Sequence, residues 1–477
     1  MDDVTELSNV FLYDRNLIYF VDRLQGFSTN VVKIETQNKS TAKANDIVSL
    51  DLPSNVLVHT RSLKMHCNAT TKAADAGGVE CGARLPPIDD LVERCETSLG
   101  GTTISQGQSF LNVYNEAQMA LGEDSCDAVF GHPEYVRAKS YVNGTAFTGL
   151  DNEHYPSDAL SRFCITKFGG FLATVDPKII DTSILPEMRL RLHMASDNVL
   201  TRSTSTVLGA TGFTLKSTTA GSPKYMLTDI HATLEIMQIA DKGYEMMVSR
   251  IMGATPTSYI ELPFKQVTSF AETHSGSSRF TVSTGSLDAV VITWRKTTYD
   301  QQEAPLVIQG HKVAGGFVAG TSSGTVDVDH GVSQYDTGGV LNTDTEKYKS
   351  QYFNFIRPQE AMTMNLQLNG ANYPQFAANL GELYGITKNS LQTKSYENKK
   401  MTLDQYMNNY CVQKFRLNML DAEETRTQSG LDTRAVNLSG YVNTNGTSGS
   451  PNLAINIFCE ATSVLRVGVG RQIELVA

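Results

Sequence analysis

The stretch Gly320-Thr-Ser322-Ser-Gly324 has the G-x-S-x-G pattern in which a serine hydrolase carries its nucleophile, and Asp327, Asp329 and His330 follow it closely. A nucleophile elbow requires a strand before the serine and a helix after it. Here the flanking residues are rich in glycine, and the two aspartates alternate with valines as in a short strand. We therefore interpret the stretch as a solvated loop, with serine hydrolysis as the weaker alternative.

The sequence contains no pattern that is typical of a metal site or a cofactor site. Asp327, Asp329 and His330 could hold a cation, but they lack the glycine and the terminal glutamate of an EF-hand loop. The nine histidines are dispersed, and His193 and His231 are expected on outward strand faces. No phosphate-binding glycine motif lies between a strand and a helix. The sequence thus predicts no catalytic, cofactor-binding or metal-binding residue.

The remaining charged candidates are read as surface groups. Asp89-Asp90 and Glu423-Glu424 are neighbouring acids in turn-like positions, where we expect them to be solvated. Arg189, Arg191 and Arg416 are expected on the outer faces of two matching strands. Paired surface charge is the preferred interpretation of these arginines, and an intersubunit or lumenal contact is the alternative.

Seven cysteines are scattered without a C-x-x-C pair, which favours a reducing compartment and no disulfide framework. Apolar residues make up 40% and charged residues 19% of the 477 residues, as in an ordinary folded protein. The formal net charge of −10 argues against a surface devoted to nucleic acid. No apolar run reaches membrane-spanning length.

One local pattern occurs twice and organises the rest. In Met362–Leu391, alternating apolar residues predict a strand, Asn369-Gly370 predicts a tight turn, and Phe376, Leu380 and Leu383 have helical spacing. The same order of strand, glycine turn and helix is found in Leu91–Leu121. The repetition indicates that one type of domain is used twice.

Other strands extend this repeat. The strand at 188–194 is matched to the one at 415–419, and the strand at 230–236 to the one at 453–459. Each half has roughly eight alternating strands and few helices, which predicts an all-β protein of two consecutive eight-stranded antiparallel jelly rolls with short helices. The predicted domains are an N-terminal arm (1–25), a first jelly roll (26–252, ending near Gly253–Pro256) and a second jelly roll (253–477) with a long loop insertion (299–350).

This arrangement resembles the double jelly-roll major capsid proteins of polinton-like viruses and virophages and, more distantly, those of large eukaryotic DNA viruses and adenoviruses. The resemblance covers about residues 30–477 and depends on the order of several motifs. These are Ile88–Arg94 with Asn112–Asn115, Asp176–Asp181 with Met188–Leu192, Asn369–Pro374, and Ser429–Arg434. Virophage relatives often carry a C-terminal segment that is removed by proteolysis, and no such cleavage is expected here.

The resemblance implies a structural protein that is not an enzyme and has no cofactor. Three copies would form a pseudo-hexameric capsomer, and capsomers would tile an icosahedral viral capsid together with penton and minor capsid proteins. The expected location is the virion, assembled inside an infected eukaryotic host cell, without specific nucleic-acid binding and without a transmembrane segment.

Two other classes of protein remain as alternatives. Jelly rolls also form carbohydrate-binding β-sandwiches, such as lectin-like receptor-binding surface proteins. Such a protein would group aromatic residues on a concave face or in an exposed loop, but the insertion contains only four, which are widely spaced: Tyr299, Phe317, Tyr335 and Tyr348. A jelly-roll enzyme of the cupin type would need clustered His and Glu on strands, which the sequence does not contain.

Overall fold

The computed structural model describes residues 27–72, 81–84, 86, 88–105, 109–121, 162–204, 206–209, 212–215, 224–239, 259–274, 276–296, 311–313, 316–318, 351–353, 355, 362–390, 406, 411–418, 430–434, 439–445 and 453–476. The predicted arm (1–25), the predicted domain boundary at Gly253–Pro256 and most of the insertion (299–350) lie outside these residues. The domain limits therefore remain predictions.

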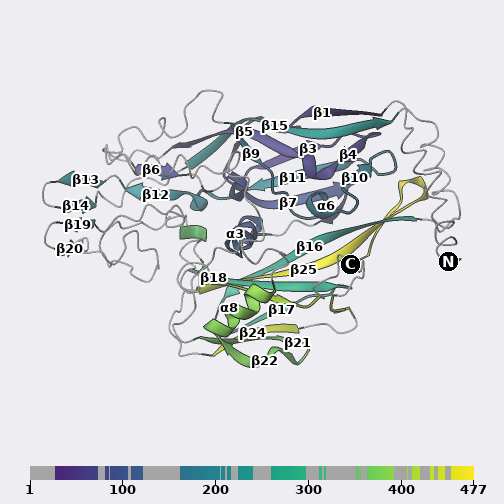
Figure 1. Cartoon of the computed structure of the whole chain (residues 1–477). Coiled ribbons are helices and arrows are strands. Elements are labelled where there is room, and N and C mark those ends of the chain that lie inside the picture. Colours follow the sequence, from purple (N-terminus) through teal and green to yellow (C-terminus); the bar gives the residue numbers. More distant parts are fainter. Residues whose placement is uncertain are drawn as a thin grey trace, which may run out of the picture.

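The first half of the chain forms two antiparallel sheets, named here after their central strands (Figure 1). Alternating apolar residues supply one buried face to each sheet. The β15 sheet has the order β10 (Ile179–Asp181), β4 (Leu57–His59), β15 (Lys224–Ile239), β5 (Lys64–Lys72), β9 (Arg162–Ile165), and β15 also pairs with β1 (Phe27–Glu35) and β2 (Ala42–Lys43). The β11 sheet has the order β3 (Ile47–Asp51), β11 (Met188–Met194), β7 (Val92–Leu99), β8 (Thr102–Ser105).

The second half repeats this construction. The β25 sheet has the order β16 (Tyr259–Thr273), β25 (Leu453–Gly468), β18 (Leu287–Lys296), β23 (Val412–Arg416), and β26 (Ile473–Val476) also pairs with β25. The β24 sheet has the order β17 (Ser277–Thr281), β24 (Ser439–Asn445), β21 (Thr363–Leu368), β22 (Ala371–Asn379).

Nine elements correspond in order between the halves. The β11 sheet begins with β3 and the β24 sheet with β17, and each sheet has the two strands of a hairpin at its opposite edge. A helix follows that hairpin in each half, α3 (Leu111–Leu121) in the first and α8 (Leu380–Asn389) in the second. Two consecutive eight-stranded jelly rolls are therefore present, which confirms the predicted fold class. In chain order, β1, β3, β5, β7, β8, α3, β9, β11 and β15 match β16, β17, β18, β21, β22, α8, β23, β24 and β25.

The predicted strand–turn–helix unit needs one correction. Asn369 and Gly370 form the turn with positive φ, but strand β22 follows it, and Phe376 lies on that strand with 54% of its surface exposed. Helix α8 begins only at Leu380, after a capping box in which Asn379 and Glu382 bond each other's backbone N–H groups. In the first half, too, strand β8 lies between the glycine turn and helix α3.

One predicted strand match is wrong. Phe415 lies in β23, which pairs with β18 in the β25 sheet and therefore corresponds to β9. The true counterpart of the strand at 188–194 is β24, because β11 lies between β3 and the hairpin strand β7, and β24 lies between β17 and the hairpin strand β21. The other match, of 230–236 with 453–459, is confirmed because these residues belong to β15 and β25.

Smaller elements complete the described chain. The hairpin β13–β14 of the first half and the hairpin β19–β20, which comes from the insertion, lie at the same end of the molecule, at the left in Figure 1. The others pack around the sheets. Their bounds are β6 (Cys81–Arg84), β12 (Thr201–Thr204), β13 (Thr206–Gly209), β14 (Gly212–Leu215), β19 (His311–Val313), β20 (Gly316–Val318), α6 (Phe171–Thr174), η1 (Thr60–Ser62), η2 (Ile88–Leu91), η4 (Asp197–Val199), η8 (Gln351–Phe353) and η10 (Val469–Arg471).

Candidate functional site: the junction between the two jelly rolls

The sequence candidates for catalysis do not form a described site. Ser322, Asp327, Asp329 and His330 lie outside the described residues. Within the part of the chain that is described, no group of three or more His, Cys, Asp or Glu side chains could hold a metal ion. Cys67, Cys95, Cys164, Cys411 and Cys459 are buried, and none of these five forms a disulfide. Buried polar groups gather instead where the two jelly rolls meet.

The inner strands of the β25 sheet, β25, β18 and β23, are buried on both of their faces. Ile455, Ile457 and Cys459 pack into the core of the second jelly roll, whereas Phe458 and Val291 belong to the core cluster of the first. A sheet covered on both sides has continuous apolar strands. This double burial explains the mostly apolar run from Ala289 to Trp294, in which the one polar residue, Thr293, is itself buried.

Helices α3 and α6 of the first half cover this sheet, and both lie between the jelly rolls in Figure 1. The ring of Tyr114 meets the ring of Phe458 edge-on at 5.4 Å, and Phe171 meets Phe264 at 5.2 Å. The backbones also join, because the N–H of Asp176 donates to the carbonyl of Pro263 at 2.9 Å. The junction thus combines apolar packing with backbone bonds and acts as an internal core.

Glu460 is the centre of a polar network in this junction. Its Oε1 accepts hydrogen bonds from Tyr114 Oη at 2.7 Å and Gln118 Nε2 at 2.8 Å, both on α3, and from Lys414 Nζ on β23 at 3.4 Å. Only 8% of Glu460 and 5% of Lys414 are exposed. Burial raises the pKa of Glu460, but the charge of Lys414 and the Tyr114 bond outweigh it, so that the pKa is lowered. Glu460 is therefore a buried carboxylate whose charge is compensated across the junction.

Arg295 provides a second polar contact between the halves. Its side chain is fully buried, and its Nε donates to Asn456 Oδ1 at 3.1 Å. The guanidinium lies over the ring of Tyr352 at 4.7 Å and over the ring of Phe110, from the first half, at 5.4 Å. Such stacking is favourable where water is excluded.

The prediction that Asp89 and Asp90 are solvated is wrong. Both are buried beneath the helix α3. Asp89 Oδ1 accepts from the backbone N–H groups of Thr166 at 2.7 Å and Lys167 at 3.1 Å. Burial, followed by the neighbouring carboxyl of Glu116 on α3, raises the pKa of Asp90 well above its ordinary value. This acid pair lies at the base of the helix that carries Tyr114 and Gln118.

The two histidines predicted on outward faces behave differently. His193 is partly exposed, and its Nε2 lies 3.5 Å from Glu96 Oε1. His231 lies opposite His66 on the outer face of the β15 sheet, as predicted, but it is buried there because its ring stacks on that of His66 at 5.3 Å.

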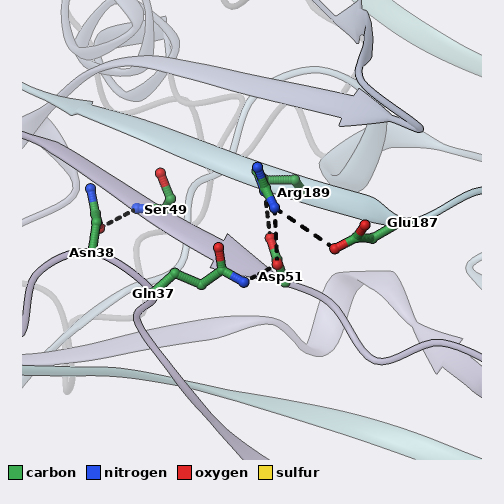
Figure 2. Close-up of polar contacts among 6 residues, drawn as sticks. All are labelled: Gln37, Asn38, Ser49, Asp51, Glu187 and Arg189. Carbon is green, nitrogen blue, oxygen red and sulfur yellow. Dashed lines mark hydrogen bonds and ion pairs between the residues drawn. The ribbon is translucent and has the colours of Figure 1, made fainter.

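Arg189 is paired within the chain on the outer face of the β11 sheet, as Figure 2 shows. Its Nε donates to Asp51 Oδ1 at 2.6 Å, its Nη2 donates to Asp51 Oδ2 at 3.2 Å, and Glu187 lies 3.7 Å away. The hydrogen bond from Arg189 lowers the pKa of Asp51 against the opposing effect of burial. The interpretation as paired surface charge holds for Arg189, while Arg191 is exposed. Arg416 lies on β23, which does not match β11, and donates to Asn418.

The turn after β1 is tied to the same sheet (Figure 2). Gln37 donates to Asp51 through its side chain and to the carbonyl of Ser49 through its backbone N–H, at 3.0 Å for the latter. Ser49 N–H in turn donates to Asn38 Oδ1 at 3.0 Å. These bonds occupy backbone groups at the β3 edge, which is otherwise a template for unwanted pairing.

Sequence reasoning missed the Glu460 network. The available signal was a glutamate that directly follows Leu453–Cys459, a stretch in which Asn456 is the one polar residue. A charged residue beside such a mostly apolar stretch indicates a buried, compensated charge. Its partners Tyr114 and Lys414 could not be assigned, because they come from distant parts of the chain.

Neither a scan against protein-family models nor a search of curated proteins finds a match. Solved structures do match over most of their length. They include the PBCV-1 virus capsid (quasi-atomic model; 12% identity, TM-score 0.51, 95% of this chain and 97% of that one) and PBCV-1 VP54 fitted into a reconstruction of the virophage Sputnik (13%, 0.53, 95% and 97%). The Faustovirus major capsid protein matches at 9% identity and TM-score 0.50, over 93% and 91%. This chain has the double jelly-roll fold of these proteins. Among the helices in the described part of the chain, none is both long and apolar enough to cross a membrane.

Proposed function

We propose that this chain is the major capsid protein of a DNA virus, and that three copies form a pseudo-hexameric capsomer. The observation that carries the proposal is the presence of two jelly rolls in one chain. They have the same order of strands and helices, and they are joined through a continuous buried core. The likeness in fold to solved capsid proteins over nearly the whole chain supports it.

The joined jelly rolls suit a lattice of hexagonal positions. A closed ring of three chains related by threefold symmetry would present six similar domains. The buried junction fixes the angle between the two domains of each chain, which a regular lattice requires. The glycine turns and hairpins can vary in length at the ends while the sandwiches stay unchanged.

The proposed role is structural and includes no catalysis. Partners would be further copies of the chain, neighbouring capsomers, and penton and minor capsid proteins, in a virion assembled inside a eukaryotic host cell. The domains proposed for this role are 26–252 and 253–477, with the arm (1–25) and the insertion (299–350) as peripheral parts. The net charge of −10 agrees with a shell protein that does not bind nucleic acid specifically.

Light scattering combined with electron microscopy of the purified chain tests the proposal. We expect a particle of about three times the 52.2 kDa chain mass, with a six-cornered outline. A stable monomer at micromolar concentration would overturn it, because a capsomer needs obligate-scale interfaces of roughly 2,000 Å² or more.

A further inference from the structure

His274 lies at the corner where the chain passes between the two sheets of the second jelly roll. It directly follows β16, which belongs to the β25 sheet, and it precedes β17, which belongs to the β24 sheet. Thr273 pairs with Ala454, so that the corner lies at the end of the sheet where β25 begins. Only 9% of His274 is exposed. A histidine is therefore buried where the two sheets are connected.

Both ring nitrogens of His274 are hydrogen-bonded to hydroxyl groups. Nε2 lies 2.7 Å from Thr444 Oγ1 on β24, and Nδ1 lies 2.9 Å from Ser278 Oγ on β17. The Thr444 hydroxyl donates to the carbonyl of Gly276 at 3.3 Å, so that its oxygen accepts from the N–H at Nε2. Nδ1 is then the unprotonated nitrogen and accepts from Ser278. The neutral ring thus connects the β16–β17 corner to β24.

The bonds of this corner converge on Thr444, the last residue but one of β24. Its backbone N–H also donates to the carbonyl of Gly276, at 2.8 Å. Strand ends open at a lower cost in free energy than strand centres. A change at His274 therefore acts on a part of the sheet that can open without the rest.

The surroundings of the ring favour its neutral form. Trp294, on β18, meets it edge-on at 6.3 Å. Glu272, an exposed residue on β16, favours the charged ring, but burial outweighs this effect and lowers the pKa of His274. The other charged side chains on the strands packed against the ring interact elsewhere. Arg279 of β17 lies over the ring of Tyr441 of β24, and Arg295 of β18 lies over the ring of Tyr352.

Acid changes the hydrogen bonding of this ring. A protonated imidazole donates from both nitrogens, so that Ser278 can no longer donate to Nδ1. Because burial lowers the pKa of His274, an opened corner binds the proton before the closed corner does as the pH falls through about 6.5. The stability of the closed corner is therefore complete above that pH. Below it, the opening equilibrium constant rises by up to about tenfold per pH unit, until the closed ring is also protonated.

We propose that His274 is an acid-sensitive switch, whose neutral ring joins the β16–β17 corner to the end of β24 and whose protonation below about pH 6.5 opens this end of the second jelly roll. The switch is a property of a single chain. It does not depend on the proposed capsomer.

Amide hydrogen exchange of the full-length chain tests the proposal, with the amides of β24 as the readout. His274→Gln keeps an N–H donor for Thr444 but cannot gain a proton in this pH range. At pH 5 we expect the β24 amides to exchange faster in wild type than in His274→Gln, by up to about 30-fold, and at pH 7 equally fast. Because the two proteins are compared at the same pH, the titration of Asp90 and of other shared groups cancels.

His231→Gln is the matched control, because His231 is also a buried histidine with a hydrogen-bonded Nδ1 but lies in the first jelly roll. We expect it to behave as wild type. Equal exchange in wild type and His274→Gln at pH 5 overturns the proposal, as does a His231→Gln protein that behaves like His274→Gln. Equal acceleration of the β7 and β11 amides in wild type also overturns it, because the whole chain then opens.

Thr444→Val is the second variant, and it decides the question if His274→Gln does not fold. It removes the hydroxyl that accepts from His274 and donates to Gly276. We expect its β24 amides to exchange about tenfold faster than those of wild type at pH 7, as for the loss of one or two hydrogen bonds, and to depend less on pH. A Thr444→Val protein with the exchange rates and the pH dependence of wild type overturns the proposal.

Discussion

Glu460 and Lys414 form a buried ion pair, in which each charge compensates the other. Replacing one partner of such a pair leaves the other charge uncompensated, at a cost of about 3 kcal/mol, whereas replacing both with apolar or neutral groups is often tolerated. We therefore expect Glu460→Gln and Lys414→Met each to lower the free energy of unfolding by about 3 kcal/mol. The double variant should recover most of that loss. Urea denaturation of the four proteins measures this, and additive losses in the double variant would contradict the proposed pairing.

Asp90 predicts a dependence of stability on pH. Its pKa is raised in the folded protein, so that above about pH 3.8 the unfolded chain loses the proton first and folding is progressively disfavoured. Asp90→Asn has no proton to lose. The difference in free energy of unfolding between Asp90→Asn and wild type should therefore favour the variant least in acid. As the pH rises, it should shift in favour of the variant by up to about 1.4 kcal/mol per pH unit, until the carboxyl of the folded wild type also ionises.

Asp51 provides a control of opposite sign. Because Arg189 lowers its pKa, Asp51 contributes stability above about pH 3.8 that is lost as the pH falls through the lower, folded value. Asp51→Asn should therefore be less stable than wild type at neutral pH, by less than about 1 kcal/mol because the site lies at the surface. In strong acid the two proteins should be equally stable. Parallel pH profiles for Asp90→Asn, Asp51→Asn and wild type would contradict both assignments.

At the scale of elements, a close contact in the β24 sheet gives a packing prediction. Gly440 lies opposite Phe280, and a Cβ added there would come within 2.2 Å of the ring. Gly440→Ala should lower the free energy of unfolding by about 1–3 kcal/mol, since the buried ring must move. Gly385→Ala is the matched control, because no atom lies within 4 Å of its added Cβ in helix α8. It should stabilise by up to about 1 kcal/mol. Melting temperatures should therefore fall in the order Gly385→Ala, wild type, Gly440→Ala.

The sequence revealed the existence and order of the elements better than their limits. Alternation along 230–236 and 453–459 was enough to match β15 with β25, because both strands bury one face in a core. Phe376, Leu380 and Leu383 fit a helical period only because strand β22 ends where α8 begins. The capping residues Asn379 and Glu382 were the local signal for the true start.

The junction could not be predicted in the same way. Periodicity describes one segment at a time, whereas the burial of Asp90 depends on α3 lying above it, and the environment of Glu460 depends on residues from both halves. The wrong match of the strand at 415–419 has the same origin. Its apolar alternation resembles that of β11, and only its pairing with β18 distinguishes the two.

At the scale of the whole molecule, the shared core predicts that the two halves unfold together. Trp294 is the only tryptophan and is fully buried in the second jelly roll, so that its fluorescence reports on that half alone. Leu190→Ala creates a cavity in the first jelly roll and should cost about 2–5 kcal/mol. We expect the Trp294 transition to shift as far as the circular dichroism transition, which reports on both halves. A Trp294 transition that stays in place would show that the halves are energetically independent.

Strands β16 and β25 also have a mechanical consequence. Every residue of β16 is paired with one of β25, and the two strands run diagonally from the second jelly roll along the first (Figure 1). A force that pulls along them would load all of these hydrogen bonds at once, in shear, so that none could break alone. Each chain would then resist stretching along these strands. An assembly under internal pressure would deform at the interfaces between chains before any chain lengthened.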